Sequence, residues 1–306
     1  MKLKDKIAIV AGGGQGIGEG IALCLAEEGA DIAVIDINPD TATGVAGKVK
    51  AMGRRALTVT ADLTEEDQVS RAIKEVADFF GRIDILVNNV GGGTPEMAQM
   101  QTEYVKTLPD AGNLPQTALV PPAVWDKTYE LNLKSHVMLS NAVTPYFVRQ
   151  RSGKIVNVSS VSGRVGEVET SHYAAAKAGD ISLTWSLARA LAPYNINVNC
   201  ICPGLVYTPL WEKTSTARWP IMRAMIQVKR SKGEKLPGWM ENWSKDDEAG
   251  MSTRDLWLKY FVTPLTPLAR EQTSEDMGRA VAFLVSEEAK NITGQVLHVD
   301  GGQIMR

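Results

Sequence analysis

Short apolar segments rich in Ile and Val alternate with longer segments of helical periodicity along the 306-residue chain. The apolar segments, which predict strands, are 6–12, 31–36, 56–60, 83–89, 153–160, 196–204 and 295–302. Most are apolar at consecutive positions, as parallel strands covered by helices on both faces should be. Helical periodicity covers 17–29, 64–80, 124–150, 172–192 and 274–286, the last with Ser274 as its expected cap. We predict an α/β fold with a doubly wound, seven-stranded parallel sheet, formed as a single domain over 1–306.

Two segments interrupt this alternation. Residues 92–122 are rich in proline and have no clean period, which predicts an insertion loop. Residues 205–265 are longer, and a segment of that length is usually functional or contains helices of its own. Within it, "WPIMRAMIQVKRSKG" has apolar residues at helical spacing and predicts a lid helix. We expect residues 205–265 as a whole to form a substrate-binding lid, called the lid segment below. It also carries five of the seven tryptophans, Trp211, Trp219, Trp239, Trp243 and Trp257.

Composition excludes several classes of function. A formal net charge of −2 gives no general attraction to nucleic acid or to an anionic membrane. The three cysteines are too few for a disulfide framework or a zinc site. His136, His172 and His298 show no ligand spacing, so we expect surface or packing roles and no metal. The apolar run near the amino terminus is too short for a signal peptide or a spanning helix, and we expect a cytoplasmic protein.

The segment "AIVAGGGQGIGEGIALCLAEEGA" predicts a strand, a glycine-rich turn and a helix. Gly12, Gly16 and Gly18 would let the backbone pass close to a pyrophosphate at the positive end of the helix. The spacing is G-x-x-x-G-x-G instead of the strict dinucleotide fingerprint, and a purely structural turn is the alternative.

An acid, Asp36, ends the second predicted strand about 20 residues on, where a carboxylate can accept both ribose hydroxyls. The alternative is a simple helix cap. Because "DINPD" contains no Lys or Arg and a carboxylate would repel a 2′-phosphate, NAD(H) is favoured over NADP(H).

The segment "SHYAAAKAGD" places Tyr173 four residues before Lys177, on one face of a predicted helix. An ordinary amphipathic helix would give the same spacing. Together with other motifs in order, however, the chain resembles the short-chain dehydrogenase/reductase family over essentially its full length. These motifs are GGGQGIG, ADL (61–63), NNVG (88–91), LNL around Asn132, NVSS, YAAAK, CPGLVYT and TGQVLHVDGG. Ala11 and Val90 depart from the usual Thr and Ala of that pattern.

The resemblance implies a Rossmann-like dehydrogenase and a catalytic set. Tyr173 would take the alcohol proton while hydride leaves for the nicotinamide. Since a free phenol has a pKa near 10, the Lys177 ammonium is needed to favour the phenolate, and it would also bond the nicotinamide ribose. Ser160, thirteen residues before Tyr173, would hold the substrate oxygen, with a strand-end cap as the alternative. Strand alternation directs Ser159 to the opposite face. Asn132 would hold a water linking Lys177 to solvent.

The resemblance also implies the cofactor contacts. Asp62 and Leu63 would flank adenine, Asn88 and Gly91 would line the adenosine side, and Val206 and Thr208 would meet the carboxamide. The full set is Gly12, Gly16, Ile17, Gly18, Asp36, Asp62, Leu63, Asn88, Asn89, Val90, Gly91, Tyr173, Lys177, Pro203, Gly204, Val206 and Thr208.

We therefore expect an NAD-dependent oxidoreductase acting on a secondary alcohol or ketone. The lid tryptophans, with Met222, Met225, Met240 and Met251, favour a bulky, mainly apolar substrate, unless they pack the lid onto the protein itself. A basic cluster suggests the alternative of a carboxylate-bearing or 3-hydroxyacyl-CoA substrate: Arg223, Lys229, Arg230, Lys232 and Lys235. Further alternatives are a non-catalytic NAD-binding regulator, a dehydratase or epimerase on the same scaffold, and a methyltransferase. The family typically forms homotetramers or homodimers, here through 124–150, 172–192 and the last strand.

Overall fold

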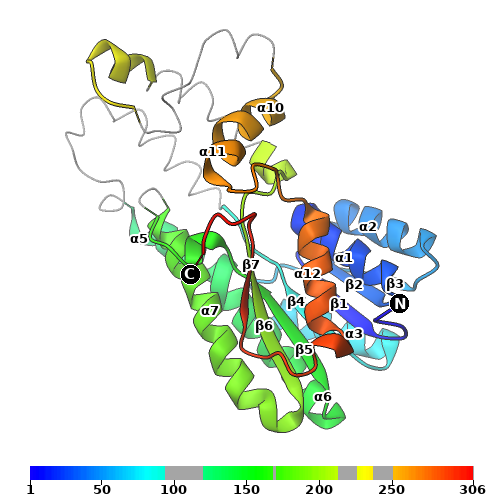
Figure 1. The fold of residues 1–306 in the computed structure, drawn as a ribbon. Helices are drawn as coiled ribbons and strands as arrows, with labels where there is room; N and C mark the ends of the chain where they lie inside the picture. The colour runs from blue at the N-terminus through cyan, green and yellow to red at the C-terminus, as the bar shows by residue number, and fades with distance from the viewer. Residues whose placement is uncertain (94–119, 168–169, 213–225, 237–250, 306) are drawn as a thin grey trace.

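The computed structural model describes residues 1–93, 120–167, 170–212, 226–236 and 251–305. Within these ranges, seven parallel strands form one sheet in the order β3-β2-β1-β4-β5-β6-β7 (Figure 1). The strands are β1 Ile7–Ala11, β2 Asp31–Asp36, β3 Ala56–Thr60, β4 Ile85–Asn88, β5 Gly153–Val158, β6 Ile196–Pro203 and β7 Val296–Val299. Every predicted strand is present, and the predicted fold class is confirmed.

Helices cover both faces of the sheet, as the continuously apolar strands require. Along β1, Ala8 and Val10 point to one hydrophobic core and Ile9 and Ala11 to the other, because successive strand side chains alternate. The first core is closed by α1 (Gly16–Glu27), α2 (Pro39–Ala51) and α12 (Ser274–Val285). The second is closed by α3 (Glu66–Phe80), α6 (Ser135–Gln150) and α7 (Ser171–Leu191) (Figure 1).

Local capping explains where the helices differ from the sequence prediction. Helix α2 was not among the predicted helical segments; Asn38 Oδ1 caps it by accepting hydrogen bonds from two backbone amides, and Pro39 occupies its first turn. The prediction that Ser274 caps α12 is wrong, because the capping residue is Thr273. Thr273 Oγ1 accepts from the amide of Asp276 at 3.1 Å, and the Asp276 carboxylate accepts from the amide of Thr273 at 2.7 Å.

The predicted helix 124–150 is divided in three. Helix α5 (Pro122–Tyr129) leads into a π-helical turn, η2 (Glu130–Lys134), which continues into α6. Asn132 lies in this turn, where its side-chain Nδ2 donates to the carbonyl of Thr128 at 3.1 Å. Single π turns of this kind occur frequently at functional sites.

The strand order changes direction between β1 and β4, which lie side by side at the centre of the sheet. In open parallel sheets, ligands bind beyond the carboxyl ends of the strands at such a switch point. The glycine-rich turn follows β1, the NNVG segment follows β4, Ser160 follows β5 and Gly204 follows β6. The fold therefore brings these four segments to the same edge of the sheet.

The described parts of the lid segment, including α10 (Thr253–Trp257) and α11 (Thr263–Leu265), lie beyond that edge (Figure 1). They also include a helix over 226–231 and a π-helical turn, η6 (Leu258–Val262). The helix over 226–231, α10 and η6 contribute to a core that contains buried Ile226, Leu236, Leu256, Trp257, Tyr260 and Val262. None of the described helices is long and apolar enough to cross a membrane.

One of the five lid tryptophans, Trp257, belongs to this core, and a second, Trp211, packs against it. Trp257 is fully buried, and the ring centroids of Trp211 and Trp257 are 6.3 Å apart. For these two side chains, packing within the lid accounts for the apolar surface. Met251, half-buried, packs against the same core. The predictions for Trp219, Trp239, Trp243, Met222, Met225, Met240, Arg223 and most of the insertion loop fall outside the described residues.

Candidate active site

The glycine-rich turn between β1 and α1 has the shape of a phosphate cradle. Gly12 and Gly16 adopt φ of 73° and 57°, which glycine does at little cost. At Gly18 a Cβ atom would lie 2.0 Å from the carbonyl oxygen of Gly12, so only glycine allows helix and turn to meet so closely. Gln15 gives α1 no side-chain cap, which leaves first-turn amides such as those of Ile17 and Gly18 for an anion. The turn therefore fits the pyrophosphate of a dinucleotide.

Asp36 braces this turn from the end of β2. Its Oδ2 accepts from the amide of Gly14 at 2.9 Å, and its Oδ1 accepts from the amide of Asn38 at 3.0 Å. A carboxylate has about four acceptor sites, so it can still accept ribose hydroxyls. Asp36 lies next to the cradle, where the adenosine ribose of a dinucleotide would be.

The segments after β4 and β6 pack against the same turn. Asn89 Nδ2 donates to the Gly12 carbonyl at 2.8 Å, and a Cβ at Gly12 would lie 3.1 Å from Val90. On the other side of the turn, a Cβ added at Gly16 would lie 3.3 Å from Cγ2 of Thr208. Asn89, Val90 and Thr208 are thus brought to the cradle.

The remaining predicted cofactor residues have structural partners of their own. Asp62 Oδ1 accepts from the amide and hydroxyl of Thr64 at 2.9 and 2.7 Å. The Leu63 side chain is buried in the core, so its main chain is what remains for adenine. Asn88 is fully buried and donates to Asn157 Oδ1 at 2.8 Å, so it supports β4 and β5 and does not line a cofactor surface.

The segment after β6 is fixed by contacts with the carboxyl-terminal part of the chain. Pro203 ends β6 opposite Val299 of β7, and a Cβ at Gly204 would lie 2.8 Å from Asp300 Cα. Val206 is buried and forms an isolated parallel bridge with Gln272. These contacts hold the start of the lid beside the switch point.

Tyr173 and Lys177 lie one turn apart at the start of α7. The Lys177 ammonium is almost completely buried and donates to the Val158 carbonyl at 2.9 Å and to Asp180 Oδ2 at 3.0 Å. Burial lowers the pKa of Lys177, but Asp180 and the neighbouring Tyr173 outweigh it, and the pKa is raised overall. An ammonium has three N–H groups, so one remains for a ribose hydroxyl.

Ser159 and Ser160, directly after β5, differ in burial and in hydrogen-bond partners. Ser159 is buried, and its hydroxyl donates to the Lys177 carbonyl at 2.7 Å. The Ser160 Oγ accepts from the amide of Ser162 at 3.1 Å, as a cap on the next short helix. Capping uses an acceptor site of this hydroxyl and leaves its O–H able to donate, so the cap and a substrate contact are compatible.

The Asn132 side chain is occupied by protein partners. Its Oδ1 accepts from the amide of Gly92 at 2.8 Å, and its Nδ2 donates to the Gly92 and Thr128 carbonyls at 3.0 and 3.1 Å. All three bonds are internal and the residue is fully buried. The side chain therefore positions the glycine segment after β4; a water linked to Lys177 would need another ligand, such as a main-chain carbonyl.

Sequence reasoning missed two residues of this site. His136, expected to have a surface or packing role, is fully buried and contacts Asp180 at 2.8 Å. Asp180 in turn is the ion-pair partner of Lys177. The available signal was spacing, since His136 follows Asn132 by one helical turn and Asp180 follows Lys177 by three residues.

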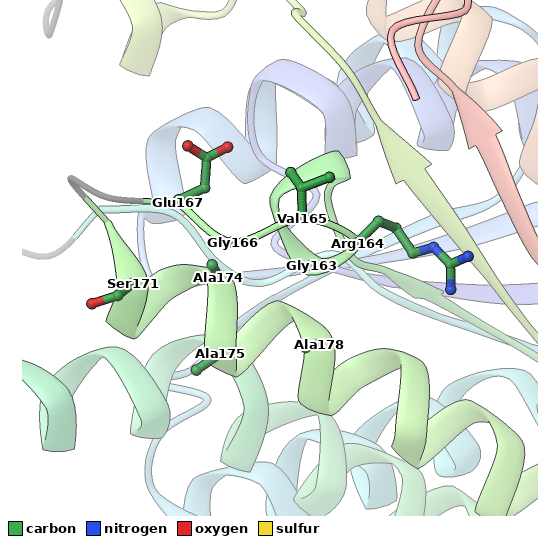
Figure 2. Close-up of a pocket in the computed structure, with 9 residues that line it drawn as sticks. All are labelled: Gly163, Arg164, Val165, Gly166, Glu167, Ser171, Ala174, Ala175 and Ala178. Carbon is green, nitrogen blue, oxygen red and sulfur yellow. The ribbon is translucent and has the colours of Figure 1, made fainter. Parts of the chain in front are cut away.

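A hollow of about 580 Å³ lies beside this site, between α7 and the 163–167 segment (Figure 2). Ala174, Ala175 and Ala178 line it from the helix. Ser160, Tyr173 and Lys177 are not part of its wall, so the candidate chemistry lies outside it. In the described part of the chain, no three or more His, Cys, Asp or Glu side chains are grouped so that they could hold a metal ion.

A dinucleotide cradle at a switch point, next to a tyrosine, a lysine and a serine, is the arrangement of a nicotinamide-dependent oxidoreductase. Comparisons with known proteins agree. A family model described as short chain dehydrogenase matches residues 6–219, and one described as enoyl-(acyl carrier protein) reductase matches 243–303. The chain belongs to the short-chain dehydrogenase family.

Two curated relatives that are named for different substrates resemble the chain over nearly its whole length. A 3-oxoacyl-[acyl-carrier-protein] reductase FabG of Staphylococcus aureus is 34% identical over 98% of both chains. The (2S)-[(R)-hydroxy(phenyl)methyl]succinyl-CoA dehydrogenase subunit BbsD of Thauera aromatica is 29% identical over 99% of this chain and 98% of its own.

Two solved structures have the same fold. A 7α-hydroxysteroid dehydrogenase in complex with NADH and 7-oxo glycochenodeoxycholic acid has a TM-score of 0.73 at 28% identity, covering 100% of this chain and 96% of its own. A levodione reductase has a TM-score of 0.77 at 27% identity, covering 98% of both chains.

Proposed function

We propose that the protein transfers a hydride between NAD(H) and a bulky, mainly apolar secondary alcohol or ketone. The observation that carries this proposal is the placement of Tyr173 beside a buried, charged Lys177 at the switch-point edge. A non-catalytic NAD-binding regulator would have no need of this pair together with Ser160. The bound nicotinamide would supply the hydride acceptor or donor.

The residues of the chain divide the remaining work. In alcohol oxidation, Tyr173 accepts the proton of the substrate hydroxyl, and Ser160 donates a hydrogen bond to the same oxygen. Lys177 stabilises the phenolate by its charge and holds the nicotinamide ribose with its remaining N–H. In ketone reduction, the same groups return the proton to the carbonyl oxygen. Asn132 keeps the segment after β4 in place through both main-chain groups of Gly92.

The apolar nature of the substrate is supported mainly by the relatives. The described part of the lid is also aromatic, with Tyr207, Trp211 and Phe261 around the core that contains Trp257, but these rings pack on one another within the lid. The related structures are named for a steroid dehydrogenase and a levodione reductase, and BbsD for a phenyl-bearing substrate.

A carboxylate-bearing or acyl-CoA substrate is the second candidate. It is supported by the names of the FabG and BbsD relatives and by basic side chains in the lid, half-buried Lys229 and exposed Arg230, Lys232 and Lys235. Lys229 is already paired with Glu234 at 3.2 Å, which weakens the cluster. The FabG relatives are named as reductases, so ketone reduction belongs in any test.

A substrate panel with purified protein tests the proposal. We expect kcat/KM to rise from cyclohexanol to decalol, by about 0.8 kcal/mol or about fourfold per buried methylene, and to stay low for sorbitol. The matching ketones and acetoacetyl-CoA would be measured with NADH and NADPH. Best activity on sorbitol or another small polyol would contradict the apolar pocket. Preference for acetoacetyl-CoA would favour the second candidate. No turnover with any of these compounds would favour a non-catalytic regulator.

NAD is proposed as the cofactor because of Asp36. Asp36→Ala should narrow the ratio of NAD to NADP activity by about tenfold, or about 1.4 kcal/mol, by removing repulsion of a 2′-phosphate and the acceptor for the ribose. Asp36→Asn removes the negative charge but keeps a side-chain oxygen that can accept the hydrogen bond from the Gly14 amide, so it distinguishes the effect of the charge from that of the hydrogen bond. Asp40→Ala, an exposed acid in the first turn of α2, is the control and should change nothing. Wild-type protein that prefers NADP would refute the assignment.

The proposed assembly is a homodimer or homotetramer. Large aromatic side chains that are exposed in the single chain support it: Trp125 and Tyr129 on α5 and Trp185 on α7. These helices belong to the two segments that the family resemblance assigned to subunit contacts.

A further inference from the structure

Three ionisable side chains are buried together behind Tyr173. Lys177 Nζ lies 3.0 Å from Asp180 Oδ2, and His136 Nδ1 lies 2.8 Å from the other carboxylate oxygen, Oδ1. The side chains of His136 and Asp180 have no exposed surface, and that of Lys177 is 4% exposed. Helices α6 and α7 thus contribute one continuous row of three charge-bearing groups, His136, Asp180 and Lys177.

The hydrogen bonds of His136 define its protonation. Its Nε2 lies 2.8 Å from the carbonyl oxygen of Val90, which can only accept, so Nε2 carries a proton. Its Nδ1 faces a carboxylate oxygen, and two lone pairs at 2.8 Å would repel each other. A proton must therefore lie between Nδ1 and Oδ1. Both ring nitrogens face oxygen acceptors, which is the environment of an imidazolium.

This proton decides the charge that Tyr173 experiences. With a neutral His136, the Asp180 carboxylate and the Lys177 ammonium would sum to zero. With the shared proton, the three groups carry a net charge of +1. An opposite charge nearby favours a phenolate, and burial strengthens the effect because screening by water is weak.

We propose that His136 and Asp180 form a positioning pair that fixes Lys177 and, by sharing one proton, prevents Asp180 from neutralising it beside Tyr173. Asp180 and the Val158 carbonyl together direct two N–H groups of Lys177, leaving the third for the cofactor. His136 also ties this arrangement to the segment after β4, through Val90, which packs on the glycine-rich turn. The inference rests on the proposed roles of Tyr173 and Lys177.

Among the described residues, the other titratable groups that face these three do not supply the compensating charge. Tyr173 itself acts on Lys177 from one helical turn away. From β6, Cys200 faces Asp180 and Lys177, but its hydrogen bond with Cys202 and its burial raise the pKa of its thiol well above the ordinary value, so it stays neutral. Burial alone would raise the pKa of Asp180, yet His136 and Lys177 outweigh it and the pKa is lowered.

The first experiment needs no substrate. The chain has three histidines, so ¹⁵N-histidine NMR at pH 7 gives few signals, and His136 is assigned by their loss in His136→Asn. We expect both Nδ1 and Nε2 of His136 to carry protons. An unprotonated Nδ1 would overturn the proposal. This result stands even if the substrate panel shows no turnover, which would be a failure of the proposed function instead.

The second experiment measures the pH profile of kcat/KM for alcohol oxidation, with the best alcohol of the panel. In His136→Asn, the side-chain amide still offers a neutral hydrogen-bond donor to Asp180 but cannot carry a positive charge. The acid limb of the pH profile should therefore move to higher pH, and kcat/KM at pH 7 should fall about tenfold. The double variant His136→Asn with Asp180→Asn removes the carboxylate as well and should return the limb toward wild type.

A merely structural ion pair would behave differently. The control is Asp31→Asn, which removes a buried carboxylate paired with Arg54 at 2.8 Å at the amino end of β2. It should lower Tm without moving the pH profile. If His136→Asn lowers Tm in the same way and leaves the acid limb in place, or if the double variant shifts as far as the single one, the proposal is wrong.

Discussion

Replacing Tyr173 with Phe is expected to lower kcat by about 10²–10⁴-fold while leaving NADH affinity nearly unchanged. Phe keeps the ring and its packing on α7 and removes only the hydroxyl that is proposed to transfer the proton. Because Lys177 is held by Val158 and Asp180 independently of Tyr173, its remaining N–H should still reach the nicotinamide ribose. Steady-state kinetics and fluorescence titration with NADH would measure the two quantities.

The matched control for this variant is Tyr194→Phe. Tyr194 lies in the turn Ala192–Tyr194 beyond the other end of α7 and is partly exposed. Removal of its hydroxyl should change neither kcat nor NADH binding. A Tyr173→Phe enzyme with kcat within tenfold of wild type would eliminate Tyr173 as the acid/base. A parallel loss of NADH affinity would instead assign the hydroxyl a role in binding.

The sheet could be predicted because its signal is local. Each strand is apolar on both faces, as β1 shows by sending Val10 to one core and Ile9 to the other. Helix α2 was harder, since Gly44 and Gly47 weaken its helical pattern and its start depends on the Asn38 cap. In the same way, the π-helical turn at Asn132 depends on bonds to Thr128 and Gly92, which no periodicity encodes.

The candidate site could be predicted only where one segment carries the chemistry. Tyr173 and Lys177 share a helix face, so their spacing was enough to pair them. His136 and Asp180 are 44 residues apart, on two helices, and their contact depends on how α6 and α7 pack. The spacing could suggest that each belongs to the site, but the shared proton required the positions of both ring nitrogens.

The lid shows the limit of arguing from composition. Its tryptophans predicted a large apolar surface, and the described residues of the lid do contain a buried aromatic core. Composition could not say whether the rings face a substrate or one another. Trp257 is fully buried within the lid, with the rings of Tyr207 and Trp211 5.2 and 6.3 Å away. For these rings, the apolar surface stabilises the lid itself, so they are not evidence for a substrate pocket.

Gly18→Ala is expected to weaken NADH binding by more than tenfold and to lower Tm. The new Cβ would lie 2.0 Å from the Gly12 carbonyl oxygen and 2.7 Å from the side-chain Nδ2 of Asn89. Either the glycine-rich turn or the start of α1 must move. Overpacking of this kind typically costs about 1–3 kcal/mol, and displacement of the turn also moves the amides proposed to hold the pyrophosphate.

Gly44→Ala is the matched control, since it makes the same chemical change in a helix of the same core. A Cβ at Gly44 would meet nothing within 4 Å, and the residue is exposed on α2. Ala is favoured over Gly inside a helix by up to about 1 kcal/mol, so this variant should be slightly more stable and bind NADH normally. Thermal unfolding and NADH titration of both variants separate close approach from helix propensity. If Gly18→Ala binds NADH as tightly as Gly44→Ala, the turn is not the pyrophosphate site.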